Sequence, residues 1–227
     1  MNRSHTLPLT AASAAAAAAL LLSGCGGDGD DDGGGKDRIA GAETGSGAPS
    51  DSARADRSDA PKIDRPKMTL PRDVSLVFDQ ATTTGPDQTA AVNDARNFVR
   101  SIRYGIVEQD ADDSAYKFYS ELQSPAQSYA KDQIKQRVDK GLSISGEMRF
   151  TRTKVSEAEN KKSAVVSFCS DSSKLFSKEV KTEKVHHTEP SISDYYSWQV
   201  LMKPSKNTNG LWRAHKVQVK EKAGECR

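Results

Sequence analysis

The stretch from Ser124 to Phe150, SPAQSYAKDQIKQRVDKGLSISGEMRF, decides the fold class, because the hydrophobic period changes within it. Ser124-Pro125 predicts a helix start, since serine caps helices and proline fits the first turn. The apolar stripe that follows has helical spacing and comprises Ala126, Tyr129, Ala130, Ile134 and Val138. Gly141 is placed to end this helix. Beyond it, Met148 and Phe150 alternate with polar residues, which predicts a β-strand.

Helical patterns also dominate the region before Ser124. One amphipathic helix is expected from about Asp87 to Glu108, with an apolar stripe made of Val92, Ala95, Val99, Ile102 and Ile106. Residues 110–114 carry an N-terminal signal for a second, short helix. A short extended lead-in is expected earlier, over 68–78, interrupted by Pro71.

Strand patterns fill the region after Phe150. Residues 164–169 alternate strictly, 175–185 form a weaker strand rich in Lys and Glu, and 196–202 and 211–219 are strong strands joined by a polar loop. Helices followed by antiparallel strands predict an α+β fold, with the helices packed on one face of a curved antiparallel sheet.

The N-terminus predicts export. Arg3 precedes an apolar stretch from Leu7 to Leu22, which has the length of a signal-peptide core and is short for a membrane span. The Leu22-Ser23-Gly24-Cys25 sequence resembles the bacterial lipobox, in which the cysteine becomes the lipidated first residue. We therefore expect a lipoprotein signal peptide over 1–24 and a diacylglycerol on Cys25 that anchors the chain to the extracytoplasmic face of the cell membrane. The alternative is an ordinary secretory signal.

A low-complexity tether is expected over 25–65. It is rich in Gly, Asp, Ser and Ala, and it holds too few apolar residues to offset the entropy of ordering it. Its aspartate run lacks the spacing of a calcium loop and is interpreted as solvated charge. The folded domain is then expected over 66–227.

Two cysteines remain once Cys25 is assigned to the lipid. In an oxidising compartment, Cys169 and Cys226 are most simply a disulfide that ties a strand to the C-terminus. The alternative is a pair of free buried thiols.

The order of these elements resembles the NTF2-like superfamily of cone-shaped α+β domains, and more narrowly the small secreted lipoproteins of high-GC Gram-positive (actinobacterial) bacteria. The features that carry the resemblance are the lipobox ending at Cys25, the helix 92–106, the strand ending in 168–171, the strand 196–202, the turn 210–212 and Cys226. The resemblance implies an N-terminal group of helices packed on a curved sheet around a pocket. It implies a fold more firmly than a function.

Five residues on apolar faces are candidates for lining that pocket: Tyr104, Tyr129, Tyr196, Trp198 and His215. Aromatic residues at such positions are more often core, and a lone strand histidine is more often a hydrogen-bonded structural residue than a base. Because the carboxylates cluster in the tether, on helix surfaces and in loops, we assign no catalytic residue. Adjacent His186 and His187 point to opposite strand faces, so no metal site is predicted.

These observations favour a non-catalytic binding or assembly module of the cell envelope. The net charge of +2 excludes a wholly basic protein, and no nucleic-acid partner is expected. An envelope protein, a wall polymer or a small apolar ligand are the partners considered. No phosphate-binding glycine loop or other cofactor motif is present, so no cofactor is predicted. The alternatives are an isomerase- or cyclase-like enzyme that uses the pocket, and a structural envelope spacer.

Overall fold

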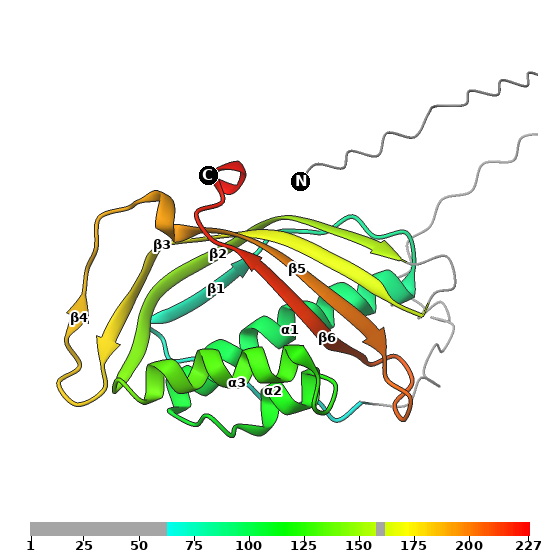
Figure 1. Cartoon of the computed structure of the whole chain (residues 1–227), viewed down its shortest axis with the longest axis horizontal. Helices are drawn as coiled ribbons and strands as arrows, with labels where there is room; N and C mark the ends of the chain where they lie inside the picture. The colour runs from blue at the N-terminus through cyan, green and yellow to red at the C-terminus, as the bar shows by residue number, and fades with distance from the viewer. Residues whose placement is uncertain (1–62, 158–161) are drawn as a thin grey trace, which may run out of the picture. The chain divides into compact units, whose positions relative to one another are not determined.

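The computed structural model describes residues 63–157 and 162–227. Its elements are β1 (Val74–Phe78), α1 (Pro86–Glu108), α2 (Ser114–Tyr119), α3 (Pro125–Val138), β2 (Leu142–Glu157), β3 (Ala164–Glu179), β4 (Val185–His186), β5 (Tyr195–Pro204) and β6 (Trp212–Lys220) (Figure 1). The predicted signal peptide, the lipidation site at Cys25 and nearly all of the predicted tether lie outside the described residues. Among the described residues, no helix is both long and apolar enough to cross a bilayer.

The strands form a single curved sheet in the order β1-β2-β3-β5-β6, with β4 paired to β3. The three helices pack against one face of this sheet (Figure 1). The predicted α+β class, with helices on a curved sheet, is therefore confirmed. The sheet is not wholly antiparallel, however, because β1 runs parallel to β2. The three helices between β1 and β2 supply the long crossover that a parallel pair needs.

Two of the helix starts predicted from the sequence, those of α2 and α3, are confirmed by their caps. The hydroxyl of Ser124 accepts a hydrogen bond from the backbone N–H of Gln127 at 3.2 Å, at the start of α3. The carboxylate of Asp113 accepts one from the N–H of Ala115 at 2.6 Å, at the start of α2. These side chains satisfy donors that have no partner within the helix, which fixes where each helix begins.

The strand pattern was predicted less well between 164 and 186. The sequence predicts separate strands over 164–169 and 175–185, but β3 runs unbroken from Ala164 to Glu179. The chain turns after Glu179, and the short β4 returns to pair with Ser177 and Lys178. The expected exposed hairpin therefore exists, but its first arm is the end of a central strand.

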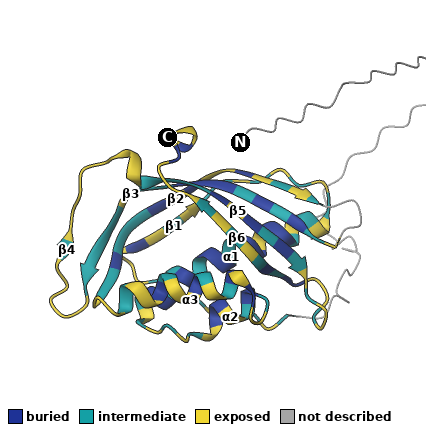
Figure 2. Cartoon of the chain, in the orientation of Figure 1, coloured by how far each residue is buried: buried dark blue, intermediate teal, exposed yellow. Residues whose placement is uncertain are grey.

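The hydrophobic core lies between the helices and the concave face of the sheet (Figure 2). The apolar stripe of α1 is buried there, together with Ala126, Ala130 and Ile134 of α3. Gly105 allows α3 to approach α1 closely, because a Cβ at this position would lie 2.6 Å from Cδ1 of Ile134.

A buried carboxylate joins α1 to the start of β6. Asp94 is fully buried and accepts a hydrogen bond from the backbone N–H of Trp212 at 2.8 Å. It also forms an ion pair with Arg65, a residue that the sequence assigns to the tether. Burial raises the pKa of Asp94, and the hydrogen bonds from Arg65 and Trp212 offset only part of that effect. Asp94 therefore holds the N-terminal lead-in, α1 and β6 together.

Asp94→Ala is expected to lower the free energy of unfolding by about 2 kcal/mol, because the buried N–H of Trp212 would lose its acceptor. Asp94→Asn keeps an oxygen at this position and should cost less than half as much. Urea denaturation of both variants tests this expectation. Equal losses for the two variants would show that the acceptor role is not what matters.

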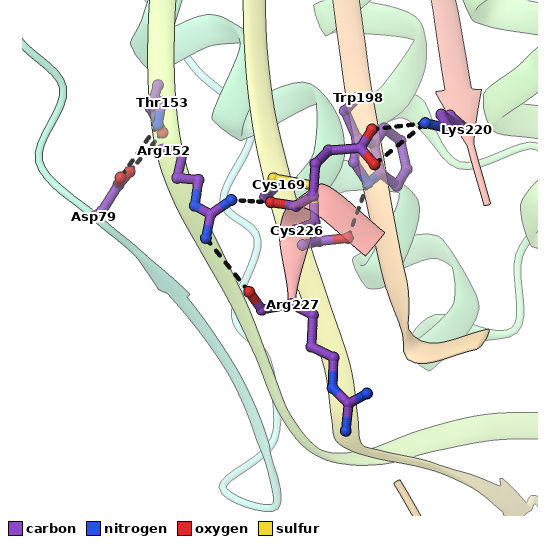
Figure 3. The surroundings of a disulfide bond; sticks show 10 residues. Asp79, Arg152, Thr153, Cys169, Trp198, Lys220, Cys226 and Arg227 are labelled. Carbon is purple, nitrogen blue, oxygen red and sulfur yellow. Dashed lines mark hydrogen bonds and ion pairs between the residues drawn. A yellow bond between two sulfur atoms is a disulfide. The ribbon is translucent and has the colours of Figure 1, made fainter. Parts of the chain in front are cut away.

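The predicted disulfide between Cys169 and Cys226 is present. The C-terminal turn that carries Cys226 lies on the side of the sheet away from the helices (Figure 1). Figure 3 shows that Arg152 of β2 also reaches this turn, where its guanidinium donates to the carbonyl oxygens of Glu225 and Arg227. The chain end is thus attached to the sheet both covalently and by hydrogen bonds.

Candidate functional site

A cavity of about 450 Å³ lies between α1, α3 and the concave face of the sheet. Its apolar lining is formed by Ile106, Ile144, Met148, Leu175, Trp198, Val217 and Val219, and its polar lining by Arg103, Tyr129, Gln133, Arg137, Ser172, Tyr196 and Glu221. This volume is in the range of small-molecule sites, which are typically mostly apolar with a few polar groups. The cavity is therefore the candidate functional site.

Arg103 is the most unusual group in the cavity. It extends from α1, and its Nη2 contacts the sulfur of Met148 at 3.6 Å. Its Nε is buried without a hydrogen-bond partner, and no carboxylate among the described residues forms an ion pair with it. Burial lowers the pKa of Arg103, although an arginine remains protonated at neutral pH. The cavity therefore contains a half-buried positive charge that has no carboxylate partner among the described residues.

Three aromatic residues line the cavity together with Arg103: Tyr129, Tyr196 and Trp198. The rings of Tyr129 and Trp198 meet edge to face at 6.1 Å, and the Trp198 indole N–H donates to the hydroxyl of Ser170 at 2.9 Å. Burial, with Glu221 adding a smaller effect, raises the pKa of both Tyr129 and Tyr196. These phenols are therefore protonated at neutral pH and available as hydrogen-bond donors.

Charged groups also mark the more exposed part of the lining. Arg137 of α3 donates to the hydroxyl of Ser177 at 2.8 Å. Glu221 follows β6 and is exposed. Its carboxylate acts on the two tyrosines, but it is not among the charges that shift the pKa of Arg103. The lining thus has an inner cation and an outer carboxylate.

Of the five candidates from the sequence, Tyr129, Tyr196 and Trp198 line the cavity. Tyr104 does not, although it is next to Arg103 on α1. Consecutive residues are about 100° apart around a helix, and this rotation directs Tyr104 to another side of α1. It is only partly buried, near Glu108 and Asp113, and its pKa is raised by burial and by these two carboxylates.

His215 also lies outside the cavity. The register between β5 and β6 shifts between Leu201 and Met202, which pair with Lys216 and Ala214 respectively. His215 is therefore the extra residue of a β-bulge, so simple alternation with Val217 and Val219 does not place it. Its Nδ1 lies 2.5 Å from Oε2 of Glu121.

Sequence reasoning missed the charged lining of the cavity, Arg103 above all. One signal was available: Val99, Arg103 and Ile106 are spaced four and three residues apart, so Arg103 occupies a position in the apolar stripe. The charged group of such a residue either extends along the helix surface to reach solvent, or it stays in the interior among specific neighbours. The sequence does not distinguish these outcomes.

The two adjacent histidines have separate partners. Nε2 of His186 lies 2.8 Å from Oε1 of Glu179, whereas the ring of His187 packs on Phe176 with 4.4 Å between centroids. Among residues 63–157 and 162–227, no group of three potential metal ligands comes together.

No family model matches the chain, and no curated protein matches it either. One similar solved structure is a ketosteroid isomerase-like protein from Erwinia carotovora atroseptica, which is 11% identical over 60% of this chain and 95% of that chain, with a TM-score of 0.40. An NTF2-like superfamily protein from Salmonella enterica serovar Typhimurium is 12% identical over 60% of this chain and 90% of that chain, with a TM-score of 0.39. The CaMKII hub of S. rosetta is 11% identical over 62% of this chain and 99% of that chain, with a TM-score of 0.37. At these values the likeness carries no information about function.

The arrangement of the chain itself agrees with the NTF2-like fold predicted from the sequence. The helices precede the long strands, and the curved sheet encloses a cavity beneath them. The chain thus has the α+β architecture, with helices packed on a curved sheet, that the resemblance implies. Because this fold hosts both enzymes and binding modules, the function has to be inferred from the cavity.

Proposed function

We propose that this protein is an extracytoplasmic lipoprotein, anchored by a diacylglycerol on Cys25, whose NTF2-like domain binds a small molecule in the cavity. The observation that carries the binding role is the cavity itself, whose lining combines seven apolar residues with seven polar or charged ones. The lipobox and the tether support the anchor and would allow the domain to sample the space near the membrane.

The lining favours binding over acid–base catalysis. An isomerase- or cyclase-like enzyme needs a base within reach of its substrate, in an environment that tunes its pKa. Among the described lining residues there is no histidine, and the carboxylate is that of the exposed Glu221. The buried Asp94 is committed to Arg65 and Trp212 and does not line the cavity.

Assembly through an apolar surface has less support than binding in the cavity. Large exposed apolar side chains mark an interface when they form a contiguous patch. In the described part of the chain they lie on separate segments: Val77 in β1, Leu122 after α2, Val180 in the β3–β4 turn and Ile192 before β5.

Val217→Trp tests whether the cavity is the binding site. The larger side chain should fill the space and lower the affinity for the uncharged dye phenylnaphthylamine by about tenfold or more, measured as fluorescence enhancement. Gln218→Trp is the matched control, because Gln218 is the next residue of β6 and is exposed. Saturable binding that Val217→Trp leaves unchanged would contradict the proposed site.

Cys25→Ser tests the anchor. Without the thiol that carries the diacylglycerol, the protein should move from the membrane fraction to the soluble extracytoplasmic fraction. Ser23→Ala is the control, because it keeps a small residue in the lipobox and should leave the protein at the membrane. If the Cys25→Ser protein fractionates like the unaltered chain, the lipid anchor is wrong.

A further inference from the structure

The cavity retains a positive charge that the fold does not neutralise. Transferring a guanidinium from water to a low-dielectric interior is costly unless an opposite charge and hydrogen bonds compensate. The contact that Arg103 makes is with the sulfur of Met148, a weak acceptor, and one of its nitrogens has no partner. Removing this charge would therefore cost the domain little stability, so its presence points to a role in binding.

The groups nearest to Arg103 do not supply the missing negative charge. The phenols of Tyr129 and Tyr196 are neutral, because burial raises the pKa of each. Arg137 is a second cation, and its proximity adds to the lowering of the pKa of Arg103. Two cations and two hydroxyl donors together form a site complementary to an anion.

The strands give the cavity an apolar wall as well. Val217 and Val219 of β6 and Ile144 and Met148 of β2 line it, and the Trp198 ring contributes a flat surface. A bare inorganic anion would contact little of this wall. The ligand that fits both parts has an anionic group and an apolar body with at least one flat portion.

Glu221 determines how such a ligand is oriented in the cavity. Its carboxylate is exposed and lines the cavity. An anionic group beside Glu221 would be repelled, whereas one beside Arg103 would be paired. The anionic group is therefore placed inward, towards α1.

We propose that the cavity binds a small amphipathic organic anion, such as a carboxylate or sulfonate on an apolar or aromatic body, through an ion pair with Arg103. This assignment rests on the proposed function of the cavity as a binding site and adds the chemical class of its ligand. Arginine suits this role because its planar donors match two oxygens of one carboxylate or sulfonate.

Two dyes that differ by one anionic group test the assignment. Anilinonaphthalene sulfonate is the anionic probe, and phenylnaphthylamine has the same ring system without the sulfonate. Both are titrated against the full chain carrying Cys25→Ser, with its disulfide intact. Arg103→Met should weaken binding of the sulfonate by about tenfold or more and leave binding of the uncharged dye within about twofold. Arg100→Met, which removes the same charge from α1 outside the cavity, should change neither affinity.

A melting temperature and a second variant at the same position show whether a loss of binding comes from a loss of folding. Arg103→Met should melt at an unchanged or higher temperature, because a half-buried cation is replaced by an apolar side chain of similar length. Should it fail to fold, Arg103→Lys provides the second comparison and should keep the preference for the sulfonate.

If Arg103→Met binds both dyes as the unaltered protein does, the anionic ligand is wrong and the cavity remains a binding site. If neither dye binds saturably to the unaltered protein, the proposed binding function fails as well. Full displacement of the sulfonate dye by an equal concentration of inorganic phosphate would overturn the amphipathic part of the assignment.

Discussion

Replacing both bridged cysteines, as Cys169→Ala with Cys226→Ala, is expected to lower the free energy of unfolding by about 4 kcal/mol. The bridge joins residues that are 57 apart in sequence, and closing a loop of this length removes considerable entropy from the unfolded chain. The native contacts of the pair are few, since the two cysteines pack with Ala223 and Tyr195 in a small cluster apart from the main core. Most of the loss should therefore arise in the unfolded state. Urea denaturation of the double variant and the unaltered chain measures it.

Two controls separate the bridge from the rest of the C-terminal turn. The unaltered chain unfolded under reducing conditions should match the double variant. Glu225→Gln removes the exposed ion pair between Glu225 and Lys220 but keeps the disulfide, and its midpoint should not change measurably (Figure 3). An unchanged midpoint for the double variant would show that the bridge does not stabilise the domain.

Gly146→Ala is expected to destabilise the domain by about 3 kcal/mol, the second largest effect. Gly146 has a φ of +108°, which side chains other than hydrogen rarely allow. A Cβ at this position would also collide with the backbone carbonyl oxygen of Lys174 in β3. Because this neighbour is backbone in a paired strand, it cannot move aside without breaking the pairing between β2 and β3.

The position of Gly146 explains why the loss should be large. Its N–H donates to the carbonyl of Asp73 at 2.6 Å, and its Cα pairs with Val74 on one side and Leu175 on the other. A shift at this point would therefore disturb three strands, beside the cavity wall formed by Ile144 and Met148. Thermal and urea unfolding test the variant, with Ser143→Ala on the same strand as the control. If both variants unfold alike, Gly146 is not a structural constraint.

Much of the fold was predictable because the relevant signals are local. Ser124-Pro125 and Asp113 mark helix starts through hydrogen bonds to residues two or three positions away, and the structure has them as expected. The helical stripe of α1 shows which face of that helix is buried, and the alternation after Gly141 shows which face of the strand is buried. The pairing of Cys169 with Cys226 followed from the number of cysteines left after Cys25 was assigned.

The errors in the prediction arose where distant segments determine the outcome. The parallel pairing of β1 with β2 depends on how the three helices return the chain to the sheet. The unbroken β3 depends on β2, which pairs with it as far as Glu179, and on β5, which pairs with it as far as Asp171. His215 was misplaced because a bulge exists only between two strands, and a single strand shows no sign of it.

By itself, the sequence determined the fold class, the helix boundaries and the disulfide, since caps, periodicity and cysteine number are properties of short segments. It also predicts the export signal and the lipid anchor, which lie outside the described residues. Only the tertiary structure decided that Tyr129, Tyr196 and Trp198 meet around a cavity, and that Arg103 lies in it with its Nε unpaired in the described part of the chain. The physical reason is that a cavity forms where surfaces from different elements fail to meet. Its position depends on how the helices and the sheet pack, including the close approach of Ile134 in α3 to Gly105 in α1.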